Sequence, residues 1–367
     1  MKKTLIALAV LGACTGAAHA QTNVTIYGLV DTGLIKESGS DVRMGGNEDS
    51  RIGFKGTGDL GSGLKATFQL ERRFNLNNGT RIAGNNALDK LQGADNGENG
   101  VDWQGAANVG LSSDTWGALR LGRVNDIAIE NFGALDPFIY YGVGSSFGAY
   151  NLLYSEELAN TVRYDSPAWA GFSLNLSYTL GNDTHHGNGE GIYGNDTGGY
   201  DDYGNDGFGI GLKYDNDPLM LTANYERIAD SDNSRLWDIG GAWTWQGFKV
   251  SVGYQDTTVE RAAARALGIA DMNIDQKDWL VGLQYNTGPH TVKFSYNRGE
   301  VESHGDYDGK ANKYSLGYTY DMSKRTSLYA MVAYTDSDND FVGEIYNSNH
   351  VADDSVTGVQ LGIAHRF

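Results

Sequence analysis

The sequence predicts an all-β fold, a 16-stranded antiparallel transmembrane β-barrel. Segments of about ten residues alternate apolar and polar side chains, as expected of strands with one face toward lipid and the other toward an aqueous interior. The connections between these segments are alternately short and long. No run of about 18 apolar residues follows residue 20, so no transmembrane helix is predicted, and only a closed barrel would then span a membrane.

The first 20 residues predict a secretory signal peptide. Lys2-Lys3 precedes an apolar stretch from Leu5 to Ala13, and Ala18-His19-Ala20 is a cleavage pattern of small residues. Cleavage after Ala20 would leave residues 21–367 as one barrel domain without the single cysteine, Cys14. A competing interpretation is a lipoprotein signal, Leu11-Gly12-Ala13-Cys14, in which Cys14 would be acylated.

Residues 23–32 illustrate the alternation that predicts each strand. Val24, Ile26 and Val30 lie on one face, and Thr25 and Asp31 lie on the other. The same pattern predicts strands near residues 23–32, 50–57, 63–74, 105–112, 115–123, 160–166, 170–180, 207–214, 218–227, 235–245, 247–256, 277–286, 290–300, 311–320, 325–335 and 355–366.

The connections show the asymmetry of an outer-membrane barrel, which has short turns on one side and long loops on the other. The short turns include residues 57–63, 112–114, 215–218, 246–247, 286–289 and 321–324. The long loops lie near 33–49, 75–104, 124–159, 181–206, 228–234, 257–276, 301–310 and 336–354. Residues 260–267 predict a short helix within one of them.

The C-terminal strand ends on an aromatic residue. Val359, Leu361, Ile363 and Phe367 share one face of this strand, and Phe367 is the last residue. This ending resembles the C-terminal signature that the assembly machinery of outer-membrane barrels recognises. We therefore expect that machinery to bind the chain through Phe367.

The net charge is strongly negative, with 28 basic and 46 acidic side chains and a net charge of −18. Phosphate groups would be repelled, so the composition argues against nucleic acid as a partner.

Several segments resemble the general trimeric porins, and among them the betaproteobacterial branch of neisserial and Burkholderia type. The matching motifs are VTIYGLVDT at residues 24–32, SRIGFKGTGDLGSGLKA at 50–66, VGLS at 109–112, WGALRLGR at 116–123, NTVRY at 160–164 and HRF at 365–367. The resemblance implies a homotrimeric diffusion pore for ions and small hydrophilic solutes, in contact with lipopolysaccharide and outer-membrane lipid. It also implies that the third long loop, residues 124–159, folds inward to form a constriction.

The candidate pore residues are charged side chains on this loop and on the barrel wall. Asp126, Glu130 and Asp136 are the acids of the loop, and by resemblance they would form the negative side of the constriction. On the wall, strand parity directs six basic side chains inward, together with Asp31 and Glu71. The basic residues are Arg51, Lys55, Lys65, Arg73, Arg120 and Arg163.

The chain also departs from its relatives. Many family members carry an arginine where this chain has residues 105–108, and a basic residue where it has Glu156 and Glu157. This thinner basic wall predicts cation preference or weak selectivity, rather than the anion preference of several relatives.

The remaining motifs favour no enzyme, metal or cofactor. Residues 336–340 begin like a calcium loop, but Phe341 replaces the required glycine; lipopolysaccharide-bridging ions are the open alternative. His185-His186 is a weak metal candidate on a glycine-rich loop. Two other functions remain open: a substrate-selective channel on the same barrel, and a barrel enzyme, for which the histidines are poorly placed.

Overall fold

The computed structural model describes residues 23–82, 102–146, 156–181, 205–230, 233–266, 272–303, 308–338 and 355–367. The predicted signal peptide lies outside these residues, as do His185-His186 and most of the loop from 336 to 354. No helix within the described ranges is long and apolar enough to cross a membrane.

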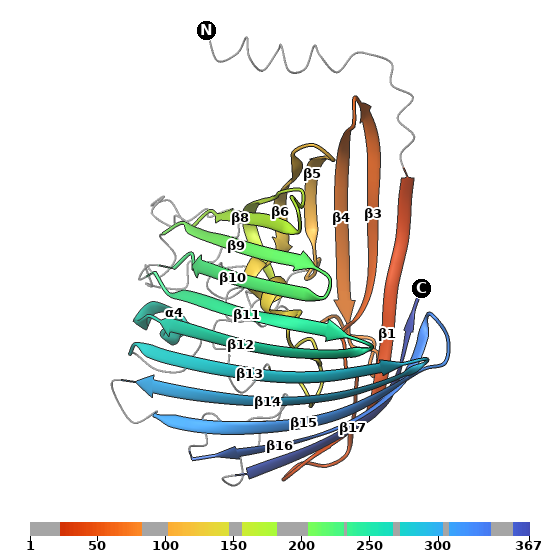
Figure 1. Ribbon diagram of the computed structural model, residues 1–367, viewed down its shortest axis with the longest axis vertical. Helices are drawn as coiled ribbons and strands as arrows, with labels where there is room; N and C mark the ends of the chain where they lie inside the picture. Colours follow the sequence, from red (N-terminus) through yellow and green to blue (C-terminus); the bar gives the residue numbers. More distant parts are fainter. Residues whose placement is uncertain are drawn as a thin grey trace.

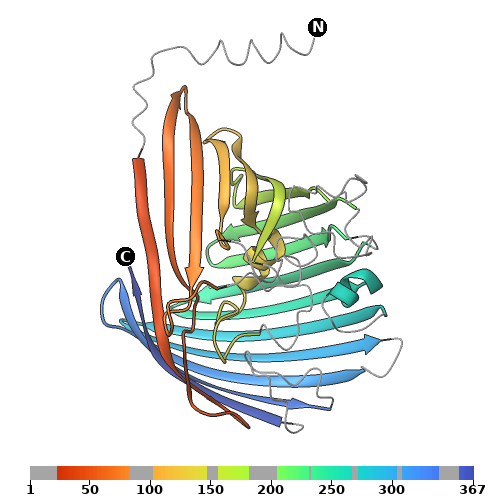
Figure 2. The same ribbon diagram turned by 180° about the vertical axis from the view of Figure 1, so that it is seen from behind.

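The fold is one closed antiparallel β-barrel (Figures 1 and 2). Within the described residues, seventeen strands form a single sheet, and β2 is only a three-residue strand inside the first long loop. The strands are β1 (Asn23–Glu37), β2 (Arg43–Gly45), β3 (Ser50–Gly61), β4 (Leu64–Phe74), β5 (Ala107–Ser113), β6 (Gly117–Asn125), β7 (Glu157–Asp165), β8 (Phe172–Thr179), β9 (Gly207–Asn216), β10 (Leu219–Arg227), β11 (Arg235–Trp245), β12 (Phe248–Val259), β13 (Ile274–Thr287), β14 (His290–Ser303), β15 (Gly309–Asp321), β16 (Thr326–Ser337) and β17 (Ser355–Arg366).

The 16 strands predicted from alternation are confirmed, with ends that differ by a few residues. The predicted loop helix is α4 (Arg261–Ala266), and its last predicted residue, Leu267, lies outside the described residues. Two elements were not predicted, β2 and the helix α3 (Ile127–Gly133). Both lie within long loops, where alternation gives no signal.

The outer face of the barrel is apolar and aromatic, as the alternation predicts. Leu212, Val252 and Leu316 are each more than half exposed, because no protein covers them. Trp237, Tyr254 and Trp279 form a row of rings on this face, with centroids 5.3 and 5.2 Å apart. Rings of this kind are typical of the interface between a membrane and water.

The described part of the third long loop lies against the opposite, polar face of the sheet. Glycines on the wall leave room for it: a Cβ on Gly253 would lie 2.7 Å from the Phe132 ring, and one on Gly317 would lie 2.6 Å from the Phe138 ring. Phe132 and Leu135 also pack with Leu280 of β13 in a buried apolar cluster. The loop therefore packs into the wall of the barrel interior.

The two ends of the chain close the barrel. β1 pairs with β17, and Gly28 and Phe367 exchange two backbone hydrogen bonds of 3.0 Å. The Phe367 ring lies over Gly28, on the outer face with Val359 and Leu361. A side chain on Gly28 has no space, since its Cβ would lie 2.4 Å from the ring and 2.6 Å from the Arg51 carbonyl oxygen.

The first prediction follows from this closure. Gly28→Val is expected to destabilise the barrel by about 1–3 kcal/mol, the usual cost of overpacking, because the Arg51 backbone cannot move aside cheaply. The temperature at which the folded band disappears on a semi-native gel should fall. Ile26→Val, a change on the same strand at a site 60 % exposed, should leave it unchanged. An equal effect from both variants would contradict this account of the closure.

Candidate functional site

The loop inside the barrel begins with helix α3, and Asp126 caps it. The Asp126 carboxylate accepts a hydrogen bond of 2.9 Å from the Ile129 amide, which satisfies a free N–H of the first turn. Burial raises the pKa of Asp126 to about 6, and this amide opposes the shift. Asp126 therefore lies within the packing between helix and wall, on the inner face of the sheet.

Asp136 organises the turn that follows. Its carboxylate accepts hydrogen bonds from the amides of Phe138 at 2.9 Å and Tyr140 at 3.0 Å, and from the amide and hydroxyl of Ser146 at 3.1 and 3.0 Å. Ile139 and Tyr140 have φ values of 53° and 61°, a conformation that non-glycine residues seldom adopt. One buried carboxylate therefore holds a strained turn in place.

Wall residues on β12, β15 and β17 fasten the loop through its backbone. Lys249 donates to the Ala134 carbonyl at 2.7 Å, Ser251 to the Leu135 carbonyl at 2.6 Å, and Lys313 to the Ser145 carbonyl at 2.5 Å. Gln360 accepts from the Val143 amide at 3.0 Å. These residues were not predicted from the sequence, although the parity that directed Arg51 inward also places Lys249 and Lys313 on the inner face.

Glu130 and Arg163 bring loop and wall together as an ion pair. Arg163 also donates to Asp165 at 2.9 Å and to the Asn125 carbonyl at 2.7 Å, and it is almost fully buried. Arg120 pairs with the same Asp165. Glu130 is the exposed acid of the loop, with 44 % of its side chain accessible.

Arg51 contacts the middle of the loop, at Tyr141. It pairs with Glu48 at 2.8 Å and is hydrogen-bonded to the Tyr141 phenol. Burial raises the pKa of Tyr141 and the nearby Glu156 adds to the shift, whereas Arg51 opposes it. The two strongest candidates for the basic wall, Arg51 and Arg163, thus both contact the loop.

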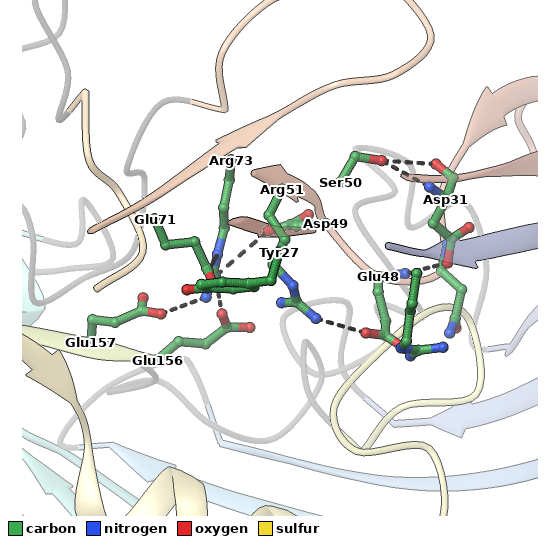
Figure 3. A network of polar contacts seen from close by, with 12 residues as sticks. Tyr27, Asp31, Glu48, Asp49, Ser50, Arg51, Glu71, Arg73, Glu156 and Glu157 are labelled. Carbon is green, nitrogen blue, oxygen red and sulfur yellow. Dashed lines mark hydrogen bonds and ion pairs between the residues drawn. The ribbon is translucent and has the colours of Figure 1, made fainter. Parts of the chain in front are cut away.

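Arg73 is the centre of a dense polar cluster beside the loop (Figure 3). Its guanidinium pairs with Glu156 and Glu157, and lies 3.3 Å from Glu71 and 3.8 Å from Asp49. Burial raises the pKa of Asp49 to about 6, and Glu156 adds to the shift while Arg73 opposes it. Arg73 is itself almost fully buried, so its ion pairs are shielded from water.

Lys55 and Lys65 differ from the arginines because neither forms a salt bridge with a described residue. Both lie exposed on the inner face of β3 and β4, and the Lys55 ammonium lies 5.0 Å above the Tyr27 ring. The described residues contain no group of three or more His, Cys, Asp or Glu side chains arranged to hold a metal ion.

A closed barrel with a lipid-facing exterior, a charged interior and a loop fixed inside it defines a transmembrane channel. A sequence model of the family described as Gram-negative porin matches residues 7–340. The chain belongs to this family, and it is an outer-membrane porin.

Individual relatives agree with this assignment. The chain is 31 % identical to an outer membrane porin of Bordetella pertussis and 29 % identical to outer membrane porin protein 32 of Delftia acidovorans, over 100 % of both chains in each case. Its fold is similar to that of the anion-selective porin from Comamonas acidovorans, with a TM-score of 0.70, 24 % identity and coverage of 95 % of this chain and 100 % of that one. A trimer form of OmpT from Vibrio cholerae has the same fold, with a TM-score of 0.64, 14 % identity and coverage of 94 % and 99 %.

Proposed function

We propose that this porin is a passive, water-filled diffusion channel without catalytic activity, and that the loop of residues 124–159 sets its width. The observation that carries the proposal is the fastening of this loop to the inner face by Lys249, Lys313 and Ser251. A loop held at many points along the wall keeps an aperture of constant size. Such an aperture sorts solutes by size without binding them tightly.

Liposome swelling tests this proposal. Vesicles containing the purified protein should swell in neutral sugars at rates that decrease steadily with sugar size and do not saturate with concentration. Rates that saturate at low concentration of one sugar would instead identify a substrate-selective channel.

Among the candidate charges, we assign two different roles. Asp126 and Asp136 serve the loop itself, since both are buried and bonded to its backbone. Glu130, with Arg163 and Arg120, places charge at the edge of the aperture, and the exposed Lys55 adds a positive charge on the inner face of β3. Paired charges of both signs create a transverse field with little net charge, which favours weak ion selectivity.

The sign of this weak selectivity should be cationic at neutral pH. Around Arg73, the five carboxylates of Glu48, Asp49, Glu71, Glu156 and Glu157 outnumber the four guanidiniums of Arg51, Arg73, Arg123 and Arg366. An excess of negative charge beside the aperture attracts cations.

The second prediction is that cation preference decreases on acidification. Asp49 has its pKa raised to about 6, so it loses its negative charge as the pH falls through that value. The reversal potential in a KCl gradient should therefore move toward the anion side between about pH 7 and pH 5. Asp49→Asn should show the smaller preference already at neutral pH and a flatter pH profile. A clear anion preference at neutral pH would contradict the assignment.

The remaining assignments concern export and partners. We propose cleavage after Ala20, recognition of Phe367 by the barrel assembly machinery, and a homotrimer in contact with lipopolysaccharide and outer-membrane lipid. The position of Phe367 at the closing seam supports the second of these, and the trimeric neighbour with the same fold supports the third.

A further inference from the structure

A second carboxylate, from the barrel wall, also caps helix α3. Glu226 on β10 is buried, and its Oε1 atom accepts a hydrogen bond of 3.0 Å from the Ala128 amide. Asp126 accepts from the next amide, that of Ile129, at 2.9 Å. Two carboxylates therefore cap the first turn of α3. Asp126 directly precedes the helix in the sequence, and Glu226 lies on the barrel wall.

The two carboxyl groups accept from adjacent amides at the same end of α3, so they are neighbours in one buried site. Two buried carboxyl groups this close repel each other unless one of them carries a proton. The Oε2 atom of Glu226 is buried and has no hydrogen-bond donor among the described residues, so it is available to carry that proton. Burial raises the pKa of Asp126, in keeping with a pair that shares one proton.

The surroundings offer little compensation if this proton is lost. Arg163 of β7 faces Asp126, but it is already paired with Glu130 and Asp165. The carboxylate of Asp238, on β11, adds negative charge and is bonded to Asn224 at 2.6 Å.

The other two strands that contact α3 are β8 and β9. Near the helix they present Asn175 and Gly211, which are uncharged. Lys213, further along β9, is paired with Asp215 at 3.1 Å. Full ionisation of the Asp126–Glu226 pair would therefore place two adjacent negative charges in a buried site.

We propose that Glu226 is a positioning residue of the constriction loop, and that the proton it shares with Asp126 holds α3 against the barrel wall. This inference rests on the proposed function, because it concerns the loop that sets the aperture. The docked loop binds the proton and a detached loop does not, so docking is favoured as the pH falls and weakened as the pH rises. The porin thereby acquires an aperture that loosens in alkaline solution.

Single-channel recordings in planar bilayers, from about pH 5 to about pH 10, test this inference. The wild-type current should be steady at acid and neutral pH and show brief steps in alkali. Their frequency should rise by up to about tenfold per pH unit, because one proton is released. Glu226→Gln should stay steady at every pH, since its carboxamide donates to Asp126 without a titratable proton.

Two further variants control the experiment. Asp126→Asn should also abolish the alkaline steps. The carboxamide N–H introduced at position 126 donates to the Glu226 carboxylate, so no shared proton is needed. Asp278→Asn changes a buried wall carboxylate of β13 that is bonded to Gln276 on its own strand, and it should keep the wild-type profile. If the current steps of Glu226→Gln appear at the same alkaline pH as in the wild type, the inference is wrong, whereas the proposed channel function is unaffected. A wild-type protein that forms no channel would instead refute the proposed function.

Infrared spectroscopy gives a readout that does not depend on conductance. At neutral pH the difference spectrum between wild type and Glu226→Gln should contain the C=O stretch of a protonated carboxyl group. A difference spectrum without this band would overturn the inference, because Glu226 would then carry no proton.

Discussion

Asp136→Ala is expected to give the largest change in conductance of any single substitution in the loop. The variant removes the acceptor for the amides of Phe138, Tyr140 and Ser146, and two of these residues are buried. A hydrogen bond to a charged group contributes about 1.5–3 kcal/mol, so the strained turn at Ile139 and Tyr140 loses the group that holds it. The loop should detach from the wall there, and both the conductance and the size limit for sugars should increase.

The barrel itself should survive this change, because Asp136 belongs to no strand. The folded band on a semi-native gel provides that check. Asp136→Asn keeps one carbonyl acceptor in place and should give a smaller increase. If Asp136→Ala folds and retains the wild-type conductance and size limit, the turn does not determine the aperture.

Arg73→Gln is expected to have the largest effect on stability. It leaves Glu71, Glu156 and Glu157 beside one another without the cation that links them. Removing one partner from a buried ion pair typically costs about 3–5 kcal/mol, because the remaining charge stays desolvated. The midpoint of thermal unfolding in detergent should fall accordingly.

Acidification should partly rescue this variant. Arg73 opposes the rise in the pKa of Asp49, so its removal lets protonation occur at higher pH and relieves the repulsion in acid. The stability difference between variant and wild type should therefore shrink as the pH falls from about 8 to about 5.

The adjacent arginine offers a matched control. Arg72 points to the outer face, where its side chain is 49 % exposed and pairs with Asp102 at 3.5 Å. Exposed pairs contribute about 0–1 kcal/mol, so Arg72→Gln should have little effect. Equal losses from the two substitutions would contradict the special role of the buried cluster.

The barrel was predictable from the sequence because each strand carries its own evidence. Alternation at residues 24–30 or 359–363 indicates directly which side chains face lipid. Such a strand can be identified from its own residues, without knowing which strand it pairs with. Helix α3 was not predicted because it has only seven residues, and its start depends on a capping carboxylate and on a wall residue far away in the chain.

Strand parity predicts that the charged side chains of the site point inward, but it does not predict which of them form ion pairs. Arg73 and Glu157 are 84 residues apart, and strand parity does not show that they pair. The same limit applies to Asp136, whose sequence context suggests an exposed loop acid although its carboxylate is bonded to the loop backbone. Which side chains neutralise one another depends on how the loop folds against the wall, a long-range property that one sequence does not display.

The central claim is that the barrel encloses a water-filled pore narrowed by the fastened loop. Single-channel conductance of the purified protein in planar bilayers tests this claim most directly. Discrete steps that grow in proportion to KCl concentration are expected, and Asp136→Ala should give larger steps. The absence of any step conductance from correctly folded protein would contradict it.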